Sequence, residues 1–216
     1  MNTEILISNV LPIIVGYLLG SIPTAVWVGK IFYGKDVRLE GSGNAGATNT
    51  IRVLGLTAGI PVLLIDVLKG LAAVLLIEPL NRFVGGTEIT PLLQLLVAVA
   101  AVLGHTLPLF AGFRGGKGVA TLLGIGLGLY PWATLLSLIT FIIVLLISKY
   151  VSLSSISAGV AFPFFVIFLF PPDNIVFMIL AVAVALFLPL THRKNIKRLL
   201  NGTEPKFTLN KSSKEN

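Results

Sequence analysis

Long runs of apolar residues, separated by short polar segments, dominate the pattern of this chain. A helix needs roughly 20 apolar residues to cross the ~30 Å hydrocarbon core of a membrane. The runs cover residues 5–31, 54–77, 91–110, 119–147, 156–170 and 175–190. The pattern therefore predicts an all-α integral membrane protein, in which each spanning helix pairs its own backbone polar groups.

The run 119–147 decides the predicted topology. As one helix of roughly 29 residues it would overshoot the membrane core and place the basic C-terminal tail outside. A break at Tyr130-Pro131 instead gives about seven spans, although the first helix of the resulting hairpin is short. It also gathers nearly all the cations of the connections on one side, which the positive-inside rule favours. We therefore expect the N-terminus outside and the C-terminus inside.

Composition agrees with a membrane protein. The 216 residues are 55% hydrophobic and 12% charged, with a formal net charge of +7. The positive charge does not indicate nucleic acid as a partner, because the cations lie in short connections where membrane orientation explains them. The chain has no cysteine and only two histidines, which excludes thiolate nucleophiles and argues against a dedicated metal site. The first run lacks a basic n-region, so we expect a retained helix.

A glycine-rich segment between the runs 91–110 and 119–147 carries the most specific chemistry. Its candidate site residues are His105, Arg114, Gly115, Gly116, Lys117 and Gly118. Glycine has no Cβ, so a glycine-rich loop can turn several amides towards one ligand. Converging amides beside two cations form an anion site. The alternative is a basic turn seated among lipid headgroups, and this segment alone leaves both interpretations open.

Two further polar segments fall on the same predicted side of the membrane. The first contains Gly41, Ser42, Gly43, Asn44, Asn49 and Arg52, and the second contains His192, Arg193, Asn195 and Arg198. The free backbone amides at the start of a helix favour binding of an anion. The alternative is that these residues form only a helix N-cap and a loop. The glycine spacing of the first segment is no dinucleotide site, because that motif needs a preceding strand. The second segment alone is typical of an anchor on acidic lipid.

Asp66 and Lys69 are charged residues inside an apolar run, where charges are costly and need partners. They are three residues apart and therefore share one helical face. Mutual neutralisation is one interpretation. The other is that they organise the floor of an active site, and the sequence does not choose between them.

Together these segments resemble the PlsY family of bacterial membrane acyltransferases. The matching residues are Gly41, Ser42, Gly43, Asn44, Gly46, Asn49 and Arg52; Gly104, His105, Pro108, Phe113, Gly115, Gly116, Lys117, Gly118 and Thr121; and His192, Arg193, Asn195, Arg198, Leu199, Gly202 and Glu204. Lesser matches are Asp66-x-x-Lys69-Gly70 and the stretch that contains Ser152 and Ser155. The resemblance runs from Leu11 to Glu204, which suggests one domain over 1–207 and a polar tail over 208–216.

The resemblance implies transfer of a fatty acyl group from acyl phosphate to the 1-hydroxyl of glycerol 3-phosphate, releasing phosphate and lysophosphatidic acid. It implies catalytic roles for His105, Lys117, Arg52 and Ser42. Asp66 and Lys69 would support the site. The residues that would bind substrate or phosphate are Gly41, Gly43, Asn44, Asn49, Arg114, Gly115, Gly116, Gly118, Ser152, Ser155, His192, Arg193, Asn195 and Arg198. The implied location is the bacterial plasma membrane, with the site on the cytoplasmic side and membrane lipid around the chain.

The residue types suit this reaction independently. Arg52, Arg114, Lys117 and Arg193 can hold two phosphate anions. The sequence contains no recognisable Ser-His-Asp triad and no cysteine. Direct attack by the acceptor hydroxyl, without an acyl-enzyme, is therefore favoured over covalent catalysis. We expect no cofactor, no metal and a monomer. A phosphate or organic-anion transporter is the alternative from another class; against it, no inverted repeat is visible and the polar motifs share one face.

Overall fold

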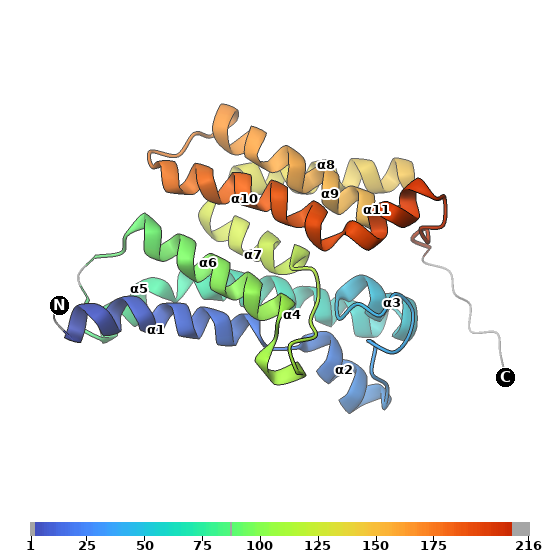
Figure 1. The fold of residues 1–216 in the computed structure, drawn as a ribbon, viewed down its shortest axis with the longest axis horizontal. Helices are drawn as coiled ribbons and strands as arrows, with labels where there is room; N and C mark the ends of the chain where they lie inside the picture. Colours follow the sequence, from blue (N-terminus) through green and yellow to red (C-terminus); the bar gives the residue numbers. More distant parts are fainter. Residues whose placement is uncertain (1–2, 87, 209–216) are drawn as a thin grey trace.

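The computed structural model describes residues 3–86 and 88–208, and the regular structure within these ranges is entirely helical. The elements are α1 (Thr3–Gly20), α2 (Thr24–Tyr33), α3 (Ala47–Leu54), α4 (Leu56–Leu75), α5 (Ile77–Phe83), α6 (Pro91–Thr106), the 3-10 turn η1 (Leu109–Ala111), α7 (Val119–Leu129), α8 (Pro131–Ser148), α9 (Val151–Phe164), the π-helical η2 (Phe165–Leu169), α10 (Ile175–Thr191) and α11 (Arg193–Leu200). Figure 1 shows their arrangement.

Local sequence signals set several helix ends. Thr90 caps α6 by accepting a hydrogen bond from the amide of Leu93, and Pro91 occupies the first helical position, where its missing N–H costs nothing. Asn174 caps α10 in the same manner. Pro131 opens α8, so the chain turns between α7 and α8 rather than continuing as one long helix.

The long helices form two layers (Figure 1). One layer holds α1, α4, α6 and α7 with the shorter α2, α3 and α5 beside them, and the other holds α8, α9, α10 and α11. Glycines let the helices of the first layer approach closely. A Cβ at Gly104 would meet the backbone of Tyr17 across the α6–α1 contact, and one at Gly124 would meet the backbone of Val67 across the α7–α4 contact.

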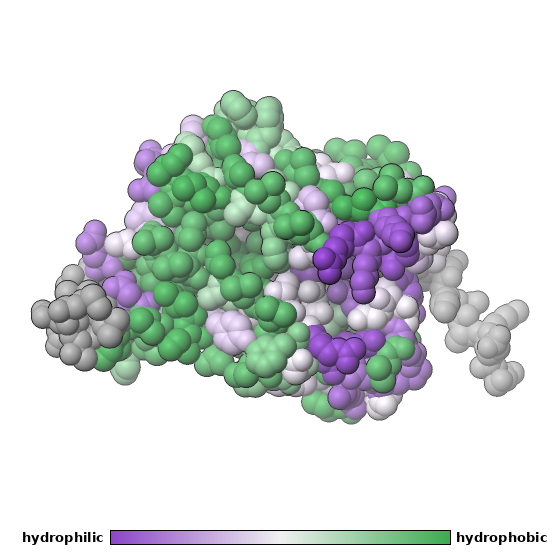
Figure 2. Space-filling view, viewed as in Figure 1, coloured by the Kyte–Doolittle hydropathy of each residue, from purple (hydrophilic) through white to green (hydrophobic). Residues whose placement is uncertain are grey.

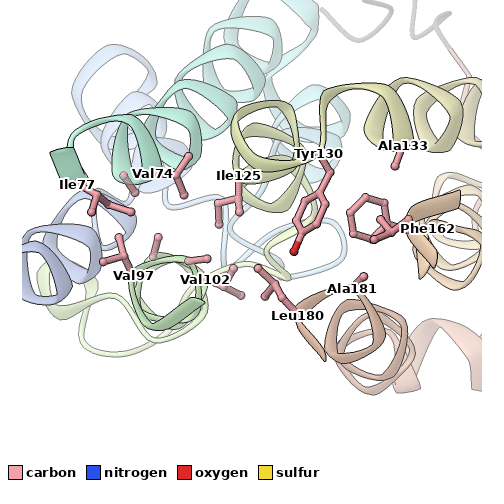
Figure 3. Close-up of a cluster of buried hydrophobic side chains, with 14 of the residues drawn as sticks. Val74, Ile77, Val97, Val102, Ile125, Tyr130, Ala133, Phe162, Leu180 and Ala181 are labelled. Carbon is pink, nitrogen blue, oxygen red and sulfur yellow. The ribbon is translucent and has the colours of Figure 1, made fainter. Parts of the chain in front are cut away.

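A hydrophobic core lies where the two layers meet (Figure 3). It brings Val102 of α6, Ile125 of α7 and Phe162 of α9 together around Tyr130, the residue between α7 and α8. The Tyr130 ring packs edge-on against Phe162 and Phe177, with centroids 5.4 and 5.9 Å away. Its hydroxyl donates to the carbonyl of Phe177 at 2.8 Å, which satisfies its buried polar end. The break between α7 and α8 is thus fixed by packing between the layers.

The surface suits a chain surrounded by lipid. Four of the described helices are long and apolar enough to cross a membrane, and these are α4, α6 with η1, α8, and α9 with η2. Two bent pairs, α1 with α2 and α10 with α11, would each make a further span, and α7 is a shorter apolar helix. Figure 2 shows an apolar face over the middle of the helices, with polar residues gathered at the end where α2, α3 and α11 lie.

The predicted helical membrane architecture is confirmed, as is the break at Tyr130. Some predicted boundaries were wrong. The run 5–31 is interrupted before α2, which bends away from α1 by 40°. Residues 151–155 of the polar link predicted over 149–155 already belong to α9, the connection 78–90 contains most of α5, and the basic tail contains α11. Seven spans, the orientation and the domain limits stay predictions, and residues 209–216 of the predicted tail lie outside the described residues.

Candidate active site

A cavity of about 600 Å³ lies between the two layers. One part of it is apolar, lined by side chains of α6 to α10 around Tyr130 and Phe162 (Figure 3). The other part is polar. The predicted site residues that line the cavity are Ser42, Asn44, Asn49, Arg52, Asp66, His105, Lys117, Gly118, Ser152, Ser155, His192, Asn195 and Arg198. Residues from all three predicted motifs therefore meet in one place.

Asn49 organises the loop that precedes α3. Its side chain is 1% exposed and donates to the carbonyls of Val37 at 2.7 Å and Glu40 at 3.2 Å. Its Oδ1 accepts from both the amide and the hydroxyl of Ser42, at 2.7 and 3.0 Å. Gly41 lies in the left-handed region with Asn49 against it, where a Cβ would not fit. A buried amide side chain thereby holds Ser42 at the cavity.

Two helix N-termini line the polar part of the cavity. The first residues of α3, Ala47 and Thr48, face it from one side, and the first residues of α7, Val119 and Ala120, face it from another. The initial amides of a helix have no partner within the helix, and the helix dipole adds partial positive charge. The arrangement can therefore stabilise anions without any bound metal.

The glycine loop supplies fewer amides than the sequence predicted. The amide of Gly115 donates to the carbonyl of Thr106, and that of Gly116 donates to the carbonyl of His105, at 3.2 and 3.1 Å. These two amides are used in folding the loop back onto the end of α6 and are not directed at a ligand. Gly118, with φ of 81°, turns the chain into α7 and lines the cavity.

Lys117 projects from the glycine loop towards the C-terminal motif. Its Nζ donates to Oδ1 of Asn195 at 2.5 Å, which joins the two segments across the cavity. Burial lowers the pKa of Lys117 to about 8; Glu204 opposes the shift, and Arg198 and Arg52 add to it. A lysine in this setting is charged at neutral pH and gains from any anion that enters.

Glu204 connects the third motif to α9. Its Oε1 accepts from Ser152 and from Asn195, and its Oε2 accepts from Arg198, each at 2.7 Å. Burial alone would raise the pKa of Glu204, but these hydrogen bonds outweigh it and the pKa is lowered. Sequence reasoning noted Glu204 in the motif but did not name it as a site residue. The available signal in the sequence was that Glu204 is the lone carboxylate in a basic segment.

His105 ends α6 beside a buried charge cluster. Asp66 forms an ion pair with Lys69 at 2.8 Å and accepts from the hydroxyl of Thr24 at 3.1 Å. The same carboxylate oxygen lies 3.8 Å from Nδ1 of His105. The ion pair shows that Asp66 and Lys69 neutralise each other, while their role in organising an active site stays a prediction. His192, the other histidine, has Nδ1 2.8 Å from the carbonyl of Leu188.

Several predicted site residues do not line the cavity. Arg114 and Arg193 are exposed side chains outside it, and Gly41, Gly43, Gly115 and Gly116 form its supporting backbone. The cations that do reach the cavity are Arg52, Lys117 and Arg198. Within the described residues no group of three histidine, cysteine or acidic side chains is placed to hold a metal ion.

The fold and cavity define a helical integral membrane protein with a chamber that is lined by apolar side chains and by the cations Arg52, Lys117 and Arg198. The chain belongs to the glycerol-3-phosphate acyltransferase family, whose profile matches residues 10–202. Similar relatives are glycerol-3-phosphate acyltransferases of Enterococcus faecalis, 43% identical over 95% of both chains, and of Listeria monocytogenes, 46% identical over 93% of this chain and 98% of the relative. The activity is accordingly acyl transfer to glycerol 3-phosphate.

Solved structures agree with this assignment. The crystal structure of PlsY, an integral membrane glycerol 3-phosphate acyltransferase, in its glycerol 3-phosphate form is 37% identical, with a TM-score of 0.80 over 93% of this chain and 96% of that chain. Its lysophosphatidic acid form is 36% identical, with a TM-score of 0.77 over 94% of this chain and 96% of that one. Membership of the PlsY family, expected from the sequence motifs, is confirmed.

Proposed function

We propose that the chain transfers a fatty acyl group from acyl phosphate to the 1-hydroxyl of glycerol 3-phosphate, forming lysophosphatidic acid and phosphate. The observation that carries this proposal is the cavity, which is cationic at one end and apolar at the other. A phosphate group suits the first environment and an acyl chain suits the second. A relative with a lysophosphatidic acid form also supports this product.

The polar end suits two phosphate groups. Arg52, Lys117 and Arg198 provide three cationic side chains, and the N-termini of α3 and α7 add backbone amides. These are donors for small anions, and no nucleotide-binding motif accompanies them. A site with donors for small anions and no nucleotide-binding motif favours acyl phosphate over acyl-CoA or acyl carrier protein as the acyl donor.

Direct transfer explains the arrangement better than an acyl-enzyme. The hydroxyl oxygen of glycerol 3-phosphate attacks the acyl carbon, the bond from that carbon to the phosphate oxygen breaks, and phosphate leaves as an anion. The hydroxyl proton passes to a substrate phosphate or to His105. Each serine of the site donates elsewhere, Ser42 to Asn49, Ser152 to Glu204 and Ser155 to the carbonyl of Val151. None of these bonds pairs a serine with a histidine base.

Catalysis would then rest on position and charge. Holding two substrates in reactive geometry is worth up to ~7–11 kcal/mol, and cations or amides near the acyl carbonyl would stabilise the developing oxyanion. We assign the cationic contribution to Lys117 and Arg52, and the positioning of the acceptor to Ser42 and His105. The acyl chain would lie between the layers, close to lipid. We place the site at the cytoplasmic side of a bacterial plasma membrane, in a monomer.

A phosphate-release assay on the purified chain tests the donor. Palmitoyl phosphate with glycerol 3-phosphate should release phosphate and form lysophosphatidic acid in equal amounts, while palmitoyl phosphate alone should release far less. Palmitoyl-CoA and palmitoyl acyl carrier protein, supplied at the same concentrations, should give little product. Comparable rates of lysophosphatidic acid formation from palmitoyl-CoA would refute the proposed donor.

A further inference from the structure

Arg38 lies outside the cavity and is the most extensively bonded arginine in the described part of the chain. Its guanidinium pairs with Asp36 through Nε at 2.9 Å and Nη2 at 2.8 Å, and both side chains are only 14% exposed. The hydrogen bond from Arg38 is the main reason that the pKa of Asp36 lies far below its usual range. Lys30 adds a weaker contact to Asp36 at 3.4 Å. This pairing fixes the direction of the guanidinium.

The remaining guanidinium nitrogen reaches a segment more than seventy residues away. Nη1 of Arg38 donates to the carbonyl of Ala111 at 2.8 Å and, more weakly, to that of Arg114 at 3.4 Å. Those two carbonyls flank the turn that starts the glycine loop. One side chain therefore joins the loop that holds Ser42 to the loop that carries Lys117.

The turn between these carbonyls has an unfavourable backbone. Gly112 and Phe113 both lie in the left-handed region, with φ of 64° and 58°. Glycine adopts this conformation freely, but Phe113 does not, because its Cβ crowds the following carbonyl. Such conformations persist when surrounding contacts hold them. The amide of Phe113 donates to the carbonyl of Pro108, and Arg38 supplies the contacts on the other side.

We propose that Arg38 is a positioning residue that holds the glycine loop in its strained turn and so keeps Lys117 at the substrate phosphate. The inference rests on the phosphate-binding role proposed for Lys117. Arg38 touches no substrate and acts only through the loop. Lysine cannot replace it, since a single ammonium group cannot pair with both oxygens of Asp36 while also reaching the two carbonyls.

Arg38→Lys is the informative substitution. Its KM for glycerol 3-phosphate should rise about tenfold, with a smaller change in kcat, because a small displacement of a binding group is costly. Trypsin should also cut the full chain after Arg114 about tenfold faster than in the wild type. Lys35→Gln, on the same segment but in an exposed pair with Glu40, is the matched control and should change neither quantity. Asp36→Asn keeps Arg38 but weakens its orientation and should shift both quantities in the same direction.

Phe113→Asn provides an independent test of the strain. Asparagine enters the left-handed region more readily than phenylalanine, and the ring of Phe113 is 56% exposed. The single variant should resemble the wild type, and the double variant with Arg38→Lys should recover part of the lost affinity. An unchanged KM or an unchanged cleavage rate in Arg38→Lys overturns the proposal, as does a double variant without recovery. Proteolysis needs no acyl donor, so it decides the loop contact even where the donor assignment fails.

Discussion

Lys117 gives a prediction with a magnitude set by its surroundings. Its pKa of about 8 means that about nine-tenths of the side chains are charged at pH 7 and about one-tenth at pH 9. If only the ammonium form binds substrate phosphate, kcat/KM for glycerol 3-phosphate should fall about tenfold over that range. Raising the pH removes the charge, so the loss lies on the alkaline side. The ratio kcat/KM reports the free enzyme, whereas a bound phosphate would raise the lysine pKa and protect kcat.

Lys117→Arg separates this explanation from other alkaline effects. A guanidinium remains charged throughout the range, so the variant should lose the alkaline fall even if its overall rate is lower. The assay is phosphate release from palmitoyl phosphate at each pH, corrected for hydrolysis without enzyme. Lys35→Arg, at an exposed position, should keep the wild-type profile. A flat wild-type profile between pH 7 and 9, or a Lys117→Arg variant with the same fall, would refute the reasoning.

Two further predictions concern His105. A Cβ at Gly116 would meet Nε2 of His105 and the carbonyl of Ala45. Gly116→Ala should therefore lower kcat up to ~10²-fold, with little change in the thermal midpoint. A variant that turns over like the wild type would show that this contact is unimportant. His105→Asn should keep clearly more activity than His105→Ala in the same assay, because an amide can still hold the acceptor hydroxyl. His105 would instead be the general base if both variants lost activity equally, by ~10²–10⁴-fold, and if a step in the wild-type pH profile of kcat were absent from both.

The sequence predicted the fold class because apolar runs and charge placement are local properties of the chain. The prediction failed where the average hydrophobicity of a run conceals the effect of a single residue on the backbone. Residues 5–31 are mostly apolar, yet the chain bends between α1 and α2 next to Pro23, which has no N–H to donate to the preceding turn. Ser154 and Ser155 were taken for part of a polar link. In α9 their hydroxyls donate to the carbonyls four residues earlier, which satisfies them inside a helix.

The site was predicted less completely, because the direction of a side chain depends on distant contacts. Arg114 and Lys117 are neighbours in one loop, and nothing local indicates that Lys117 enters the cavity while Arg114 stays exposed. Arg38 counted only as one of the cations that set the predicted orientation and not as a site residue, since its partners at Ala111 and Arg114 lie far along the chain. The sequence identified three segments that meet at one cavity, but it could not assign the individual donors within them.

Glu204 shows why the proposed anion site can contain a carboxylate. Three donors occupy its two oxygens, so little of its charge is left to repel a substrate. Its bond to Asn195 turns that amide so that Oδ1 faces Lys117, and its bond to Arg198 fixes the guanidinium at the cavity. The acid therefore fixes the guanidinium of Arg198 directly and the ammonium of Lys117 through Asn195. Preorganised charge of this kind costs no rearrangement when phosphate binds, which is the condition under which electrostatic catalysis is most effective.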